Sequence, residues 1–389
     1  MAVTTELTRQ LKIQHPIMLA GMGQTSGSEM AAAVSNAGGL GVIGGVGYTN
    51  EMLKEMIAEL KSLLRDPSLP FGVDLLIPQV GGSARKTNVD YTKGKLDDLV
   101  ETIIAGGASM FVSAVGVPPK RVVDRFHEAG VLVMNMVCYQ PPYRSCGFYE
   151  IARWLRGGSP TSNADKISMD NGFYIRRSNS DNSRRLVTQS MSIKRVPLVS
   201  ISFAPRVARL VVILQYKSPL TGKPVQLVAA GGVNDGRSLA AALMLGAQAV
   251  WIGTRFVTAK ESGASKFAKQ AVIDADFDSA VKSVVWSGRP LRALSNAYIK
   301  DWELNRQPQI KELTDQGKVP LEYELDRLHA AGELTEEIQD NATLRPMGVV
   351  AGMVNKPNQS AKEIVDEIVA EAAEILGSAN QYVSSKARL

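Results

Sequence analysis

The amino-acid sequence predicts an α/β protein built on a closed (β/α)8 barrel, with a small helical subdomain added. Apolar strands alternate with amphipathic helices, and these strands are continuously apolar, as in parallel sheets covered by helices on both faces. Five strand–helix units before residue 137 and two after residue 226 fit an eightfold closed barrel better than an open sheet. The chain has 389 residues, and a TIM barrel takes roughly 250, which leaves room for the addition.

The elements before residue 137 follow one another regularly. Ser26 or Ser28 can cap the first helix, proline lies in the first turn of the fourth at residue 118, and Gly106 ends the third. Each start or stop signal falls where the apolar pattern changes its period. The predicted strands are 16–20, 40–43, 71–76, 109–114 and 131–136, and the predicted helices are 26–37, 50–64, 95–105 and 118–129.

Residues 138–217 form an atypical middle segment. It carries 10 Arg, 3 Lys and 4 acidic residues, a local charge of +9 in a chain whose total is +6. It is rich in Ser, and its one sustained apolar run is Leu210–Leu214, a weak strand candidate. We expect 159–190 to be loop or disordered, and the sixth barrel strand to lie between 137 and 225. The basic residues indicate a solvated segment rather than nucleic-acid binding, because no single-strand binding fold accompanies them.

Two strand ends after residue 226 predict an anion site. One apolar strand ends at Ala230 and runs into Gly231 and Gly232; after a helix at 236–245, a second strand at 249–252 runs into Gly253 and Thr254. Small residues at strand ends offer main-chain N–H groups that can surround an anion, and the last two strands of such a barrel commonly hold a phosphate. The alternative is two ordinary turns; we favour a phosphorylated cofactor.

The rest of the chain is mainly helical. We expect helices at 290–302 and 322–334 in a subdomain spanning 260–345, after a barrel spanning 1–259. Residues 346–389 then supply a closing segment, a last barrel helix at 360–376 and a polar tail.

Composition limits partners and location. No apolar run reaches the roughly 18 residues of a membrane helix, and no secretion signal opens the chain. Cys138 and Cys146 are too few for a disulfide framework or a four-ligand zinc site, so we predict no metal. We expect a cytoplasmic protein, or a peroxisomal one if the terminal Ala387-Arg388-Leu389 acts as a targeting signal.

Taken together, these motifs resemble the nitronate monooxygenases, FMN flavoproteins formerly called 2-nitropropane dioxygenases. The resemblance rests on residues 16–23, 71–74, the two glycine turns and 345–352, within matches at about 10–137 and 218–378. It implies FMN as cofactor, with its phosphate at Gly231, Gly232, Gly253 and Thr254. It also implies flavin contact by Ala20, Met22 and Gly23, where a main-chain N–H near the ring would stabilise reduced flavin, and by Asp74, which stands where many members have Asn.

One expected feature is missing. The resemblance implies a Gly- and His-containing loop after strand six, whose His takes a proton from the nitroalkane carbon. The three histidines of this chain are His15, His127 and His329, and none follows that strand. We therefore leave the catalytic base unassigned, and expect oxidation of preformed nitronates by O2 and poor reaction of neutral nitroalkanes.

Two alternative readings of the chain remain. Residues 138–217 could come from an altered reading such as a retained intron, which would make the chain an inactive product. An enoyl reductase-like enzyme that uses FMN and NAD(P)H would share the barrel and the cradle. The substrate, the use of NAD(P)H and the oligomeric state are left open.

Overall fold

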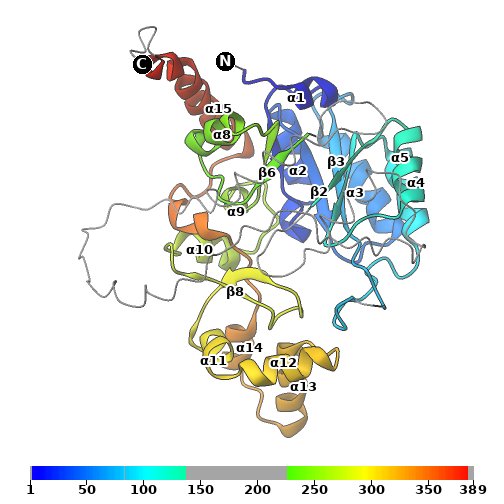
Figure 1. The fold of residues 1–389 in the computed structure, drawn as a ribbon, viewed down its shortest axis with the longest axis vertical. Helices are drawn as coiled ribbons and strands as arrows, with labels where there is room; N and C mark the ends of the chain where they lie inside the picture. Colours follow the sequence, from blue (N-terminus) through cyan, green and yellow to red (C-terminus); the bar gives the residue numbers. More distant parts are fainter. Residues whose placement is uncertain (1, 83, 137–225, 384–389) are drawn as a thin grey trace, which may run out of the picture.

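The computed structural model describes residues 2–82, 84–136 and 226–383. Within them, parallel strands follow one another in the order β6-β7-β1-β2-β3-β4-β5 (Figure 1). β1 joins β2 through a parallel bridge between Met18 and Leu40. In it, Leu40 N–H donates to Ile17 O at 2.8 Å, and Leu19 N–H donates to Leu40 O at 2.9 Å. The strands are β1 (Ile17–Leu19), β2 (Gly41–Gly45), β3 (Phe71–Leu76), β4 (Met110–Ala114), β5 (Leu132–Asn135), β6 (Val228–Ala230) and β7 (Ala249–Ile252).

This order is that of a (β/α)8 barrel, in which strands consecutive in the sequence lie side by side and the last strands return to pair with the first. The predicted positions of all these strands are confirmed to within one or two residues, and Phe71–Leu76 is reproduced as predicted. The expected sixth barrel strand, the strand candidate Leu210–Leu214, the loop at 159–190 and the terminal residues 387–389 lie outside the described residues.

Helices cover the outer face of the strands, and side-chain caps fix the starts of three of them. The helix that begins at Ser28 has Gly27 as its N-cap with no side-chain hydrogen bond, so the predicted cap by Ser26 or Ser28 is wrong. The Thr49 side chain accepts from Met52 N–H, and Asp235 and Ser360 form capping boxes with Ser238 and Glu363. The barrel helices are α2 (Ser28–Asn36), α3 (Asn50–Leu63), α4 (Leu96–Gly106), α5 (Lys120–Glu128), α8 (Gly236–Met244), α9 (Thr254–Val257) and α15 (Ala361–Ser378), and short 3₁₀ turns are η1 (Gly23–Ser26), η2 (Val349–Met353) and η3 (Ala379–Tyr382).

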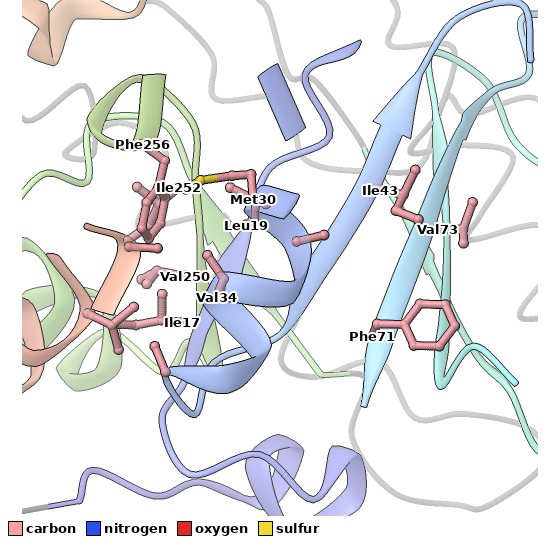
Figure 2. Close-up of a cluster of buried hydrophobic side chains, with 14 of the residues drawn as sticks. Ile17, Leu19, Met30, Val34, Ile43, Phe71, Val73, Val250, Ile252 and Phe256 are labelled. Carbon is pink, nitrogen blue, oxygen red and sulfur yellow. The ribbon is translucent and has the colours of Figure 1, made fainter. Parts of the chain in front are cut away.

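Alternate side chains of the strands enter two different cores. Ile17 and Leu19 of β1 face outward with Val250 and Ile252 of β7, and pack near Val34 of α2 (Figure 2). The other set faces the barrel interior, which α1 (Glu6–Leu11) closes at the amino ends of the strands. That interior set is Met18, Ala20, Leu40, Val42, Met110, Val112, Ala249 and Trp251.

Residues 285–342 build a separate cluster, seen below the barrel in Figure 1. Buried Trp302, Ile299 and Leu313 lie at its centre. The predicted helix at 290–302 is wrong in its first half, because Leu291–Leu294 is a strand, β9, paired antiparallel with β8 (Ala280–Ser283). The helices are α10 (Lys266–Ile273), α11 (Ala297–Asn305), α12 (Gln307–Asp315), α13 (Pro320–Ala331) and α14 (Glu336–Ala342). The domain limits at 259 and 345 stay predictions.

Candidate functional site

The two glycine turns begin side by side at the carboxyl edge of the barrel. β6 and β7 pair in parallel with Ala230 opposite Trp251, so Gly231 and Gly232 leave one strand beside the point where Gly253 leaves the other. Gly231 and Gly232 both have φ +81°, and the space where a side chain would begin is open at each. Residues that carry a side chain rarely adopt this backbone conformation, so both positions favour glycine. The arrangement leaves main chain, without side chains, facing the edge of the barrel.

The loop after β1 lies against the second turn. Ala20 N–H donates to Ile252 O at 2.8 Å, which holds the two strand ends together. A Cβ added at Gly253 would lie 3.3 Å from Met22 Sδ and 3.5 Å from Ala20 Cβ. Gly253 therefore lets Ala20 and Met22, predicted to meet a flavin ring, approach the predicted phosphate turn.

Within that loop, the Met22 main chain is already engaged. Its N–H donates to Ser26 Oγ at 2.7 Å, so this donor is used inside the protein and is not free for a ligand. Gly23 follows with φ +56°, opens η1, and has nothing within 4 Å of the position of a Cβ. The Met22 side chain packs against three groups of buried side chains: the barrel interior, the core between strands and helices, and a cluster that contains Val257 and Met347.

Asp74 lies on the other side of the same loop. Asp74 is on β3 opposite Gly44 of β2, and only 2% of its surface is exposed. A Cβ at Gly21 would overlap Asp74 Oδ2, and a Cβ at Gly44 would overlap the Gly21 main chain. The two glycines therefore make the space in which the carboxyl group sits.

The Asp74 carboxyl group has no protein partner in the described part of the chain. Its Oδ1 is fully buried and accepts no hydrogen bond. Burial raises the pKa of Asp74 from its ordinary value of 3.8 to about 7, because water no longer stabilises the charge. The nearby Tyr48 hydroxyl donates to Gly44 O at 2.8 Å, and burial together with Asp74 raises the pKa of Tyr48 to about 12.

Thr254 connects the cradle to the C-terminal part of the chain. Gly348 N–H donates to Thr254 Oγ1 at 2.8 Å. The residues just before Gly348 pair with β9, through a bridge between Pro346 and Ala293. The segment 345–352, which the resemblance implies closes over the site, is thus hydrogen-bonded to Thr254. The Thr254 side chain therefore stabilises the fold, whether or not it also contacts a ligand.

None of the chain's three histidines is on a described barrel strand or in the turns after β1, β6 and β7, and all three fall in the described residues. His15 precedes β1 at the amino end of the barrel, where burial lowers its pKa and Nδ1 has no partner. His127 on α5 and His329 on α13 are exposed. In the ranges described, no three His, Cys, Asp or Glu side chains gather as metal ligands. No described helix is long and apolar enough to cross a membrane.

Sequence reasoning missed the packing that isolates Asp74. Gly21, Gly44 and Tyr48 were not among the predicted site residues, although a Gly-Gly pair inside an apolar strand is a signal of close backbone approach. It also missed a braced turn after β4, where Asn135 Nδ2 donates to Gly116 O at 2.5 Å and Ser113 Oγ donates to the same oxygen at 3.0 Å.

Similarity to known proteins agrees with this arrangement. The nitronate monooxygenase family matches residues 4–139 and 199–371. A probable nitronate monooxygenase of Staphylococcus haemolyticus is 28% identical over 320 residues, which cover 78% of this chain and 82% of that protein. FabK from Thermotoga maritima superposes with a TM-score of 0.63 at 24% identity, over 98% of this chain and 100% of that one. Nitroalkane oxidase from Streptomyces ansochromogenes gives a TM-score of 0.60 at 21% identity, over 96% and 99%.

The chain therefore belongs to the nitronate monooxygenase family, a family of oxidoreductases. The family match is interrupted between 139 and 199, inside the middle segment that composition marks as atypical. It resumes earlier than the predicted residue 218, so the interval that departs from the family is shorter than 138–217.

Proposed function

We propose that this member of the nitronate monooxygenase family is an FMN-dependent enzyme that oxidises alkyl nitronates with O2. The observation that carries the proposal is the paired turn at Gly231–Gly232 and Gly253–Thr254, which lies in reach of Ala20 and Met22. Main chain without side chains suits a phosphate, and the neighbouring small and apolar residues suit a planar ring. When bound, FMN would take electrons from the nitronate and pass them to O2.

Different residues of the carboxyl edge would bind the two parts of the ligand, its phosphate and its ring. Gly231, Gly232, Gly253 and Thr254 would hold the phosphate, and Ala20, Met22, Gly23 and Asp74 would meet the ring. The fit rests on two features: the space where side chains would start is open at Gly231 and Gly232, and Asp74 Oδ1 is buried without a partner. A buried polar atom left unpaired in the apoprotein is satisfied when a ligand supplies its partner.

The proposed substrate is the nitronate rather than the neutral nitroalkane. A neutral nitroalkane must lose a carbon-bound proton first, and His is the side chain most often used for such a step. His15 precedes β1, His127 is on α5 and His329 is on α13, so none of them belongs to the turns of the proposed site. A preformed nitronate needs no base, so it can react in a site without one.

Anaerobic reduction of the bound flavin tests this function. Purified protein is mixed without O2 with ethyl nitronate, with nitroethane or with NADH, and the visible flavin absorption is followed. We expect nitronate to bleach the flavin at least tenfold faster than either other reagent. Rapid bleaching by NADH alone would replace the proposal with the enoyl reductase-like alternative. Protein that binds no flavin would favour the inactive product.

We propose a peroxisomal or cytoplasmic location, decided by the terminal Ala387-Arg388-Leu389. The chain with a fluorescent protein at its N-terminus should give punctate signal that becomes diffuse when Leu389 is deleted. Diffuse signal with Leu389 present would assign the protein to the cytoplasm.

A further inference from the structure

Asp74 is the one ionisable side chain on the inner face of the described barrel strands. The alternation that sends Val73 and Leu75 outward turns Asp74 inward. Every other inward position on these strands is apolar or glycine. The larger of these side chains are Met18, Val42, Met110, Val112, Leu132, Met134, Val228 and Trp251. A carboxyl group in apolar surroundings lowers the stability of the fold, and ionisable groups buried in this way are often functional.

The groups around Asp74 leave its charge unpaired. On β2 it faces Gly44, and on β4 it faces Val112. Gly21 covers it from the loop after β1. The other titratable group nearby is Tyr48, whose hydroxyl proton is used in the bond to Gly44 O. No cation or main-chain donor of the described residues therefore compensates a carboxylate here.

An uncompensated carboxyl group stays neutral where it can. Asp74 has a pKa of about 7 for this reason, so it carries a proton in slightly acidic solution and loses it at pH 8. A ring laid over Gly21 and Met22 would remove the remaining water from this end of the barrel and disfavour the charged form further. The neutral acid, in contrast, can donate its O–H to an acceptor atom on the ring edge.

We propose that Asp74 binds the flavin as a neutral carboxylic acid, so that flavin binding takes up one proton from solvent at this side chain. The inference rests on the proposed function, because it requires a flavin at the carboxyl edge. The only covalent bond that forms is the O–H bond of the Asp74 carboxyl group, and the proton is released by the buffer acid in solution. Binding and proton uptake are then linked, and affinity falls as pH rises above 7.

Calorimetric titration of the apoprotein with FMN counts this proton directly. The heat is measured at pH 8 in two buffers with different heats of ionisation, and the difference gives the protons taken up per FMN bound. We expect about one proton in the wild type and about none in Asp74→Asn. Tyr48→Phe is the matched control, since it removes the neighbouring hydroxyl and should leave the uptake at about one. A phosphate monoester titrates near pH 6, so the phosphate of FMN contributes little at pH 8 and equally in all three proteins.

The pH dependence of the uptake, compared between the wild type and Asp74→Asn, provides a second test. At pH 5 the side chain is already protonated, so uptake at Asp74 should vanish; subtracting the Asp74→Asn signal removes the phosphate contribution. Between pH 7 and 9, the dissociation constant for FMN should rise up to tenfold per pH unit relative to Asp74→Asn.

Three results would overturn the inference: no uptake at pH 8, equal uptake in Asp74→Asn, or tighter binding at high pH. The last would mean that Asp74 binds as a carboxylate. FMN that binds and is bleached by nitronate without proton uptake would overturn this inference and leave the proposed function standing. FMN that fails to bind at any pH would overturn both.

Discussion

The carboxyl edge of the barrel has two sides that differ in how they can hold a ligand. At the ends of β6 and β7, Gly231 and Gly232 present main chain only, and the space around them is open. In the loop after β1 and near the end of β2, Gly21 and Gly44 are packed so closely that a Cβ on either would overlap its neighbour, and the buried carboxyl group of Asp74 on β3 lies beside them. The first side depends on backbone geometry and should be insensitive to pH. The second depends on one titratable side chain and should not be.

The largest effect is expected from adding charge to the backbone side. Gly232→Asp should lower FMN affinity at least about thousandfold, because two like charges about 4 Å apart near a protein surface repel by roughly 4 kcal/mol. Gly332→Asp is the control, since Gly332 ends α13 far from the site and has a similar φ of +71° with open space around it. Both variants carry the same backbone strain. Equal flavin content in the two proteins would reject the phosphate assignment.

The buried carboxyl group of Asp74 should make the unfolding free energy of the apoprotein depend on pH. The raised pKa of Asp74 means that the folded state holds its proton more tightly than the unfolded chain. Stability is therefore lost as pH rises from about 4 to 7, by about 4 kcal/mol in total. Asp74→Asn has no such proton, so its stability relative to the wild type should grow over that window and level off above pH 8.

Urea unfolding at a series of pH values measures this difference. Asp66→Asn is the control, because Ser68 hydrogen bonds lower the pKa of the exposed Asp66 and confine its effect to acid pH. Its difference from the wild type should stay flat between pH 5 and 8. A flat difference for Asp74→Asn as well would show that the carboxyl group is not isolated.

A smaller effect is expected where the backbone side meets the C-terminal segment. Thr254→Val removes the acceptor for Gly348 N–H and should cost about 1 kcal/mol in unfolding free energy. Thr258→Val is the matched control, because the buried Thr258 Oγ1 has no partner to lose. That variant should be neutral or slightly stabilising. Equal losses in both would mean that the Gly348 bond contributes nothing.

The two sides also differ in how far the sequence could predict them. The turns at Gly231–Gly232 and Gly253–Thr254 were placed because small residues directly follow apolar strands, and strand register then brings them together. Asp74 was placed within the predicted strand 71–76, but its isolation depends on Gly21, which follows β1, and on Gly44 of β2. That packing is tertiary and leaves no periodic signal in β3 itself.

The same limit explains the misread strand. Leu291–Leu294 contains Leu, Arg and Ala, which favour helices in isolation. It forms β9 because it pairs with β8 on one side and Pro346 bridges to Ala293 on the other. The barrel strands, in contrast, are buried on both faces, so their apolar runs were enough to locate them.

Titration of the apoprotein with FMN and riboflavin side by side tests the central claim most directly. The two ligands share the ring and differ in the phosphate, so their affinity ratio isolates the backbone side of the edge. We expect FMN to bind at least a hundredfold more tightly than riboflavin in the wild type, and we expect Gly232→Asp to remove this preference. Equal affinity for the two ligands in the wild type would contradict a phosphate site at Gly231, Gly232, Gly253 and Thr254.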